Sequence, residues 1–207
     1  MIFVSAAPAA DAETGRSTPM LAGSFCSTGC GRAVLTVKNL DVRSEYDSMI
    51  DFEHVSKEYK KGGRLALEDI SLHVEEGEFV FLLGHSGAGK STLLKLILRE
   101  ELPTSGKVTV LGKDVAHLRR RKVPYLRRQM GIIFQDFRLI PSMTVYENIA
   151  FAMHVTNVKR SVIRERVEYM LELVHLEDKA KVYPDTLSGG EQQRVGIARA
   201  VVNKPAV

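Results

Sequence analysis

One eight-residue run, Gly84–Ser91 (GHSGAGKS), restricts the possible folds of this chain more than any other feature. It matches the phosphate-binding pattern G-x-x-x-x-G-K-[ST] in full. The run lies between the apolar segment 78–83 and the helix-forming segment 91–100, and a phosphate loop needs a strand before it and a helix after it. A glycine-rich turn that binds nothing would need neither the lysine nor the serine. We therefore predict a phosphate-binding loop in an α/β domain.

The residues of this loop have distinct predicted roles. Gly84, Gly87 and Gly89 allow the tight turn in which backbone N–H groups point at phosphate oxygens. Lys90 is expected to reach the β- and γ-phosphates, and Ser91 to offer its hydroxyl to Mg²⁺. Phosphoryl transfer depends on positioning and charge more than on acid–base chemistry. His85 is therefore interpreted as a variable position of the loop and not as a catalytic base. The predicted phosphate-loop residues are Gly84, His85, Ser86, Gly87, Ala88, Gly89, Lys90, Ser91 and Thr92.

Strand-like and helix-like segments alternate from residue 49 onward, which predicts an α/β domain around a mainly parallel sheet. The nearly continuous apolar run 78–83 is typical of a strand buried on both faces. The expected strands are 49–55, 66–74, 78–83, 106–112 and 130–135, and the expected helices include 91–100 and 161–176. In the last helix one face carries the apolar residues Val162, Ile163, Val167, Met170, Leu171 and Val174, and the other carries Arg164, Glu165, Glu168 and Glu172.

Residues 1–48 are rich in Ala, Ser, Thr, Gly and Pro and show no lasting apolar period. We expect them to be mostly disordered or a wrongly assigned N-terminal extension, with translation starting at Met49. They contain both cysteines, Cys26 and Cys30, which have no histidine nearby and are interpreted as free thiols. The folded domain is therefore expected to be 49–207.

A second anion-binding element is predicted at residues 187–193, LSGGEQQ. Ser188 and Glu191 have the spacing of a capping box, in which the two side chains close the start of a helix. Between them, Gly189 and Gly190 leave backbone N–H groups open to an anion. An ordinary capped helix would explain Ser188 and Glu191 but not the two glycines.

Taken together, the phosphate loop and the LSGGEQQ run resemble the ATP-binding subunits of ABC transporters, from about residue 49 to the end of the chain. The resemblance implies a P-loop NTPase fold of the ABC type that works as a homodimer. In that family two copies pack head to tail, and the signature run of each closes over the ATP held by the other. Ser188, Gly189, Gly190 and Glu191 would therefore face the partner's ATP, with Glu191 where many members have glutamine.

The same resemblance assigns the cofactors, ATP and Mg²⁺, and two further residues. Tyr59, in SKEYKKG, is similar to the aromatic residue that stacks on adenine. An aromatic residue in a surface turn can also serve packing alone. Gln135, in IIFQDF, is similar to the glutamine that contacts Mg²⁺ together with Ser91 and that senses the membrane partner.

Residues 119–153 narrow the resemblance to the cell-division ATPases of the family, mainly through FQDFRLIP and TVYENIAFAM. This implies a peripheral protein on the cytoplasmic face of the plasma membrane that acts with the membrane protein FtsX. Lipoprotein-release and macrolide-export ATPases are the alternative. They more often carry Phe-Asn where this chain has Phe137 and Arg138.

The basic cluster within residues 119–128 fits either nucleic acid or a helix face near an anionic membrane. ABC-like ATPases that act on DNA insert a long coiled coil between the P-loop and the signature. Only 98 positions separate Lys90 from Ser188, so we expect no nucleic-acid partner.

In the family, the segment beyond the signature helix supplies the Walker B aspartate and the catalytic glutamate. This chain ends at Val207, before either, so no catalytic residue is predicted within it. The resemblance therefore implies a domain incomplete at its C-terminus, with negligible ATP hydrolysis and a tendency to aggregate. A nucleotide-binding regulatory module that does not hydrolyse ATP is the remaining alternative.

Overall fold

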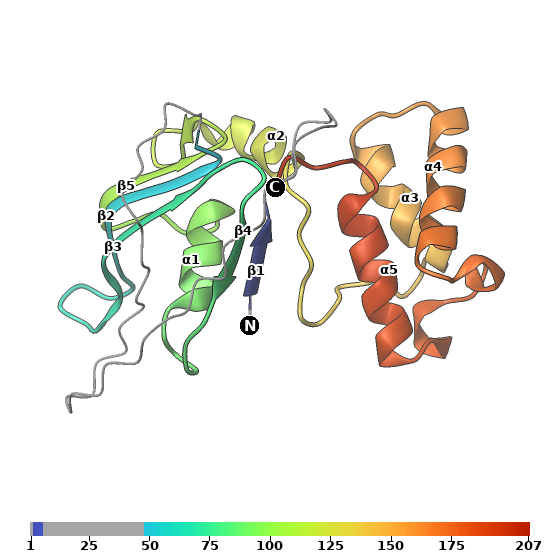
Figure 1. Ribbon diagram of the computed structural model, residues 1–207, viewed down its shortest axis with the longest axis horizontal. Helices are drawn as coiled ribbons and strands as arrows, with labels where there is room; N and C mark the ends of the chain where they lie inside the picture. The colour runs from blue at the N-terminus through green and yellow to red at the C-terminus, as the bar shows by residue number, and fades with distance from the viewer. Residues whose placement is uncertain (1, 6–47) are drawn as a thin grey trace, which may run out of the picture. The chain divides into compact units, whose positions relative to one another are not determined.

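The computed structural model describes residues 2–5 and 48–207 and consists of two compact units. Unit 1 comprises residues 1–123 with Val207, and unit 2 comprises residues 124–206. Figure 1 shows the strands of unit 1 and the helices of unit 2. Each unit is described by itself.

Unit 1 combines strands with one α-helix and one short 3₁₀ helix. Its elements are β1 (Ile2–Ser5), β2 (Ile50–Glu58), β3 (Leu65–Val74), β4 (Phe79–Leu82), α1 (Lys90–Ile97), β5 (Ser105–Val110), β6 (Lys113–Asp114) and η1 (Arg120–Lys122). The helix α2 (Val123–Arg127) begins at the unit boundary. Unit 2 continues with α3 (Val145–Val155), α4 (Arg160–Leu173), η2 (Glu177–Lys179), η3 (Pro184–Thr186) and α5 (Gly189–Val201).

The larger sheet of unit 1 has the strand order β3-β2-β5-β6, and every pairing in it is antiparallel. The short connection between β2 and β3 requires this orientation, because parallel neighbours need a long crossover. Apolar residues of β2 such as Ile50, Phe52 and Val55 are buried. The helix α1 packs against β3 and β5 and covers the core side of these strands (Figure 1).

The strand before the phosphate loop, β4, pairs antiparallel with β1, with Ile2 opposite Leu82. All strand pairings among the described residues are therefore antiparallel, and the expected mainly parallel sheet is corrected. No helix lies between β2 and β3 or between β5 and β6, so these neighbours pair as hairpins and not through the long crossovers that parallel strands need. The expectation that β4 is buried on both faces is also wrong, because Phe79 and Phe81 are 47% and 50% exposed and pack edge to face on each other.

The expected strand at 130–135 does not form, because this stretch lies against the C-terminal segment and not beside another strand. The carbonyl of Gln129 accepts a hydrogen bond from the N–H of Ala206 at 2.8 Å. A Cβ at Gly131 would lie 2.7 Å from the carbonyl oxygen of Ala200, so this stretch runs directly against the chain at the end of α5. Contacts with the C-terminal segment thus replace a strand ladder.

Only part of the N-terminal range 1–48 is described. Residues Ile2–Ser5 form the strand β1, and the expectation for the range 1–48 as a whole stays a prediction. An apolar run of strand-forming residues finds a ladder partner in β4. Residue 1 and residues 6–47, with Cys26 and Cys30, lie outside the described residues. Met49 extends the ladder at the start of β2, since its N–H donates to the carbonyl of Val74 at 2.9 Å.

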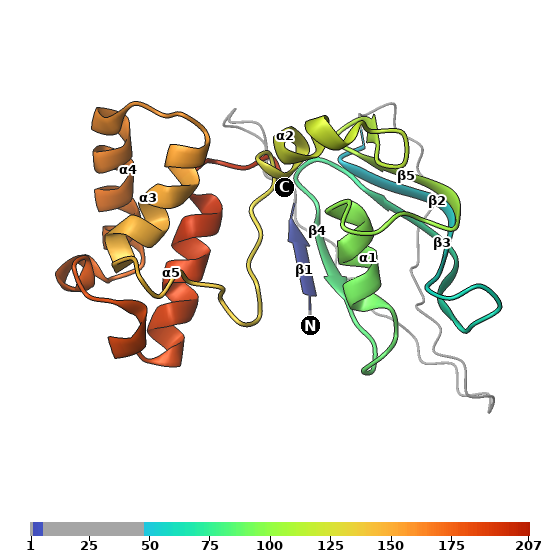
Figure 2. The ribbon, with the colours of Figure 1, turned by 180° about the vertical axis from the view of Figure 1, so that it is seen from behind.

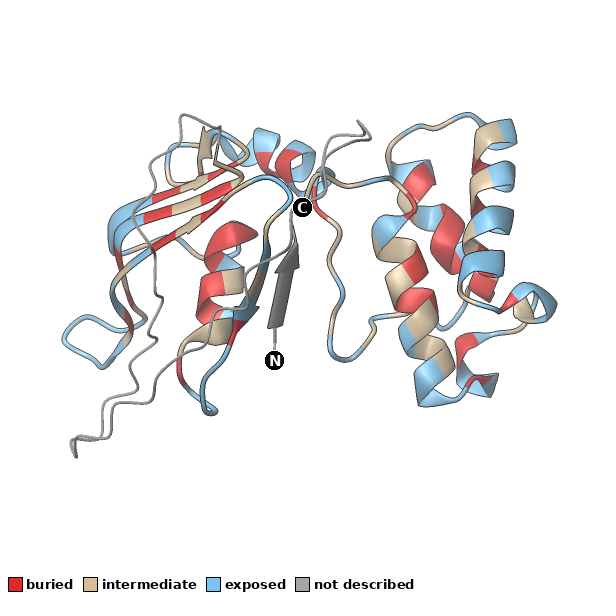
Figure 3. Ribbon diagram, in the orientation of Figure 1, coloured by how far each residue is buried: buried red, intermediate tan, exposed pale blue. Residues whose placement is uncertain are grey.

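Unit 2 is a group of three helices, α3, α4 and α5, around one apolar core (Figure 2). The amphipathic pattern predicted for 161–176 is confirmed. Ile163, Val167 and Leu171 are buried in this core, while the four charged residues predicted for the opposite face, Arg164, Glu165, Glu168 and Glu172, are exposed (Figure 3). Within residues 2–5 and 48–207, no helix has the length and apolarity that crossing a membrane requires.

The helix α3 was not predicted, although its start carries a recognisable signal. Thr144 and Glu147 form a capping box. The side chain of Asn148 is fully buried and holds the loop before α3 through four hydrogen bonds of 2.8 to 3.1 Å. Its partners are backbone groups of Ile140, Met143 and Thr144. This clamp fixes the segment that leads from Gln135 into α3.

Candidate functional site

The phosphate loop connects β4 to α1, as the sequence predicted. Gly87 and Gly89 have φ angles of 82° and 89°, which side chains with a Cβ rarely adopt. A Cβ at Gly89 would also lie 2.5 Å from the carbonyl oxygen of Ala66. Glycine at this position therefore lets the start of α1 lie directly against β3.

The N-terminus of α1 is not capped by any side chain, and its first turn contains no acidic residue. The helices α3 and α5 differ, because each is closed by a capping box. The first N–H groups of a helix have no partner within the helix and carry its positive end. The start of α1 can therefore accept an anion through its backbone.

The ammonium group of Lys90 lies over the same loop. It donates hydrogen bonds to the carbonyl oxygens of Gly84 at 2.6 Å and His85 at 2.8 Å. The Nδ1 atom of His85 donates to the carbonyl of Ser86 at 2.7 Å. The loop thus combines a positive side chain with an open helix end, which is the arrangement that a phosphate group requires.

Tyr59 lies beside the start of α1. Its hydroxyl is 3.2 Å from the hydroxyl of Thr92, and its ring is half exposed. The ammonium groups of Lys57 and Lys95 lie 5.1 and 6.0 Å from the ring centre. A fixed, accessible aromatic face next to a phosphate loop can stack on a base.

The two predicted Mg²⁺ ligands lie in different units. Ser91 is exposed in the first turn of α1, and Gln135 is exposed in a turn of unit 2. Both supply oxygen atoms, the ligand type that Mg²⁺ prefers. The described residues contain no cluster of His, Cys, Asp or Glu that could hold a metal. This donor set fits an ion that is bound mainly by phosphate oxygens and water.

The signature residues stand at the start of α5, where Ser188 and Glu191 form the predicted capping box. The N–H and hydroxyl of Ser188 each donate to a carboxylate oxygen of Glu191 at 2.8 Å. Lys179 donates a further hydrogen bond to the other oxygen of Glu191. The hydrogen bond from Lys179, and then those from Ser188, lower the pKa of Glu191 from 4.5 to about 2.

The contact between Lys179 and Glu191 is expected to make the free energy of unfolding depend on pH in the acid range. Because the folded pKa of Glu191 is below its ordinary value, its contribution to stability is complete above pH 4.5 and is lost as the pH falls through about 2. In Glu191→Gln, urea unfolding should give a smaller free energy than wild type at neutral pH, and the difference should shrink below pH 4.5. A difference that stays constant down to pH 2 would contradict the assignment. Glu165→Gln, on the exposed face of α4, is the control.

The two signature glycines are not required by the packing of this chain. A Cβ at Gly189 would meet nothing within 4 Å, and one at Gly190 would meet only Arg194 at 4.0 Å. Neither glycine has a positive φ. The space next to their backbone is thus open, and another molecule could approach the helix end closely.

The structure groups the predicted residues by unit. Tyr59 and the residues of Gly84–Thr92 belong to unit 1, and Gln135 and Ser188–Glu191 belong to unit 2. Sequence reasoning missed Lys179, because no spacing rule connects it to Glu191 twelve residues later. It also missed the capping box of α3, although Thr144 and Glu147 show the same spacing as Ser188 and Glu191.

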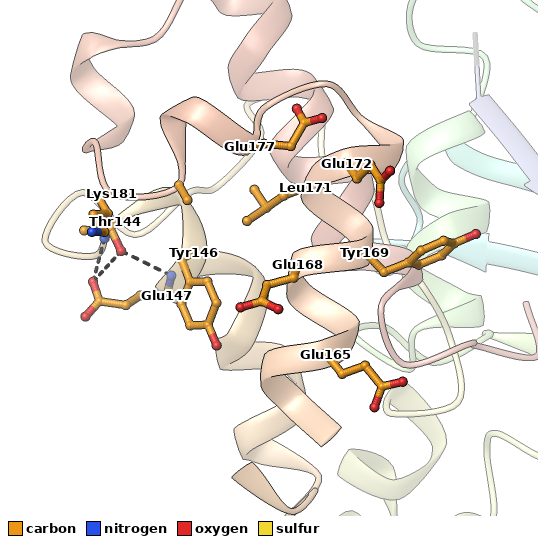
Figure 4. A pocket seen from close by; sticks show the side chains of 11 residues that line it. Thr144, Tyr146, Glu147, Glu165, Glu168, Tyr169, Leu171, Glu172, Glu177 and Lys181 are labelled. Carbon is orange, nitrogen blue, oxygen red and sulfur yellow. Dashed lines mark hydrogen bonds between the residues drawn. The ribbon is translucent and has the colours of Figure 1, made fainter. Parts of the chain in front are cut away.

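Unit 2 also contains a hollow of about 870 Å³ that does not resemble a nucleotide site. It is lined by α3, α4 and the segment around η2 (Figure 4). The carboxylates of Glu165, Glu168, Glu172 and Glu177 are among its lining groups. These negative charges oppose the entry of a triphosphate, so the hollow does not compete with the phosphate loop as a nucleotide site.

Comparison with known proteins agrees with this geometry. The sequence model of the family described as "ABC transporter" matches residues 67–207. The cell division ATP-binding protein FtsE of Escherichia coli (strain K12) is 57% identical over 159 residues, which cover 77% of this chain and 71% of that protein. FtsE of Bacillus subtilis (strain 168) is 50% identical, with 77% and 69% covered. The dimeric ATP-binding cassette MJ0796 bound to ADP and Pi has a TM-score of 0.66 at 34% identity, with 76% and 71% covered.

Proposed function

This chain belongs to the ABC transporter family, and on that premise we propose that it is the ATP-binding subunit of a complex in bacterial cell division. Relatives at 50% and 57% identity, from Bacillus subtilis and Escherichia coli, are both named cell division ATP-binding proteins. The observation that carries nucleotide binding is the uncapped start of α1 beneath the ammonium of Lys90.

The ligand proposed for this site is ATP with Mg²⁺. The residues of Gly84–Thr92 would surround the phosphates with backbone N–H groups, and Lys90 would exchange its two loop carbonyls for phosphate oxygens. The exposed ring of Tyr59 would stack on adenine. Ser91 and Gln135 would hold Mg²⁺, which when bound neutralises phosphate charge.

We propose that the working form is a homodimer in which each signature faces the nucleotide of the other copy. The open space beside Gly189 and Gly190 supports this arrangement, because a phosphate can then reach the backbone N–H groups of α5. Lys179 offsets the charge of Glu191, which would otherwise repel that phosphate. The related cassette MJ0796 has been solved as a dimer with ADP and Pi.

We further propose the membrane protein FtsX as partner, with this chain on the cytoplasmic face of the plasma membrane. The resemblance of residues 119–153 to cell-division members supports this choice, and Gln135 lies within that stretch. ATP-driven closure of the dimer would then be passed to FtsX through the segment around Gln135. No nucleic-acid partner is proposed.

Co-purification from membranes tests the partner directly. The tagged chain is co-expressed either with FtsX of the same genome or with the membrane subunit of a lipoprotein-release transporter. We expect recovery with FtsX only. Recovery with the lipoprotein-release subunit alone would instead assign the chain to that branch of the family. ATP binding without recovery by either subunit would favour a regulatory module.

A further inference from the structure

The turn that follows Gln135 has an unusual backbone conformation. Phe137 and Arg138 have φ angles of 54° and 45°, and neither is glycine. Two consecutive residues with side chains in the left-handed region cost free energy, and they persist only where surrounding contacts hold them. Within the turn, the N–H of Phe137 donates to the carbonyl of Phe134 at 3.1 Å. The guanidinium of Arg138 also lies 3.4 Å from a carboxylate oxygen of Asp136 and 4.1 Å from the ring centre of Phe134.

The side chain of Arg199, on α5, binds this turn from the outside. Its guanidinium donates to the carbonyl oxygen of Phe137 at 2.6 Å and to that of Arg138 at 2.7 Å. Two donors of one planar group thus bind the carbonyls of the two left-handed residues. Burial lowers the pKa of Arg199, which agrees with a guanidinium enclosed by this contact.

Gly196, three residues earlier on the same helix, lies close to the turn. A Cβ at this position would lie 3.9 Å from the Cβ of Phe137 and 4.0 Å from its carbonyl oxygen. The turn therefore lies beside α5 at Gly196, with room for a methyl group between them, and is held by the side chain of Arg199. Both residues belong to one helix, and that helix begins at the signature glycines.

We propose that Arg199 is a positioning residue that fixes the turn after Gln135 to the signature helix, so that Gln135 and the Ser188–Gly190 end move as one body. The proposal rests on the proposed function, in which both ends contact bound nucleotide. The helix α5 spans 13 residues without a break. A displacement at its N-terminal end therefore reaches Arg199 and, through two carbonyls, the turn beside Gln135.

Hydrogen exchange of the whole chain, followed by mass spectrometry, tests this positioning role. In Arg199→Met, amides of residues 134–140 should exchange about tenfold faster or more, because hydrogen bonds to a charged group are lost. Arg199→Lys should give an intermediate rate, since one ammonium replaces two guanidinium donors. Arg160→Met, an exposed arginine at the start of α4, is the matched control and should leave the rate unchanged.

A second substitution separates positioning of the turn from general support of α5. Phe137→Gly adopts a positive φ without strain and keeps the contacts of Arg138 with Asp136 and Phe134, so in the Arg199→Met background it should restore much of the protection of residues 134–140. If Arg199 only stabilises α5, Phe137→Gly will restore nothing, and the proposal is overturned. Unchanged exchange of residues 134–140 in Arg199→Met would overturn it as well.

Addition of ATP and Mg²⁺ separates this proposal from the proposed function. In wild type, nucleotide should slow exchange at both the phosphate loop and residues 134–140. In Arg199→Met it should slow exchange at the loop only. If ATP protects nothing in wild type, the proposed function fails while the contact of Arg199 with the turn can still be measured. If ATP protects residues 134–140 equally in both proteins, the positioning role is refuted.

Discussion

Replacement of Lys90 by methionine is expected to weaken the binding of ATP with Mg²⁺ by tenfold to more than a hundredfold. The ammonium of Lys90 lies over the loop on the carbonyls of Gly84 and His85, where the phosphates are proposed to bind. Hydrogen bonds to charged groups contribute about 1.5–3 kcal/mol, which corresponds to roughly this range of affinity. Methionine keeps an unbranched side chain, one heavy atom shorter, and removes the charge and the donors.

Isothermal titration calorimetry with ATP and Mg²⁺ measures the effect. Lys61→Met, in the exposed loop between β2 and β3, removes one positive charge from the same unit and is the control for general electrostatic attraction. Its dissociation constant should stay close to that of wild type. Equal affinities for wild type and Lys90→Met would refute the assignment of the phosphate loop.

Gly89→Ala is expected to lower the free energy of unfolding more than any other substitution in the phosphate loop. A left-handed backbone costs a residue with a Cβ about 1–2 kcal/mol, and overpacking of a close contact costs about 1–3 kcal/mol. Both apply here, because Gly89 has a φ of 89° and a Cβ would lie 2.5 Å from the carbonyl of Ala66 and 2.7 Å from a methyl group of Leu67. The expected loss is therefore roughly 2–5 kcal/mol.

Gly87→Ala separates these two causes. Gly87 also has a positive φ, of 82°, but a Cβ there would meet nothing within 4 Å. For this variant we expect only the cost of the left-handed backbone, about 1–2 kcal/mol. Urea titrations followed by far-ultraviolet circular dichroism compare the two proteins. Equal losses of unfolding free energy would show that the close approach to Ala66 does not add to the destabilisation by Gly89→Ala.

The structure confirms the predictions that depend on short-range signals. The helix α1 begins at Lys90 because a left-handed glycine precedes it, and α5 begins after Ser188 because a capping box closes it. In α4, apolar residues with helical spacing define the buried face. Each of these features is encoded within about one turn of chain, where backbone angles and local hydrogen bonds decide.

Two of the failed predictions concern segments whose neighbours are distant in the sequence. The apolar stretch 130–135 has the composition of a strand, but its backbone lies against the end of α5 instead of a ladder. Likewise, β4 has the sequence of a fully buried strand and pairs with β1, leaving Phe79 half exposed. Composition records that a segment is apolar, but not which surface will cover it.

The sequence by itself therefore determined the phosphate loop, the two helix starts and the amphipathic face of α4, since each depends on residues no more than a few positions apart. Only the tertiary structure decided the partner of β4, the contact of Lys179 with Glu191 and the hydrogen bonds from Arg199 to the turn beside Gln135. Arg199 and Arg138 are 61 positions apart. No local rule connects them, because their contact exists only once collapse of the core of unit 2 has placed α5 beside the turn.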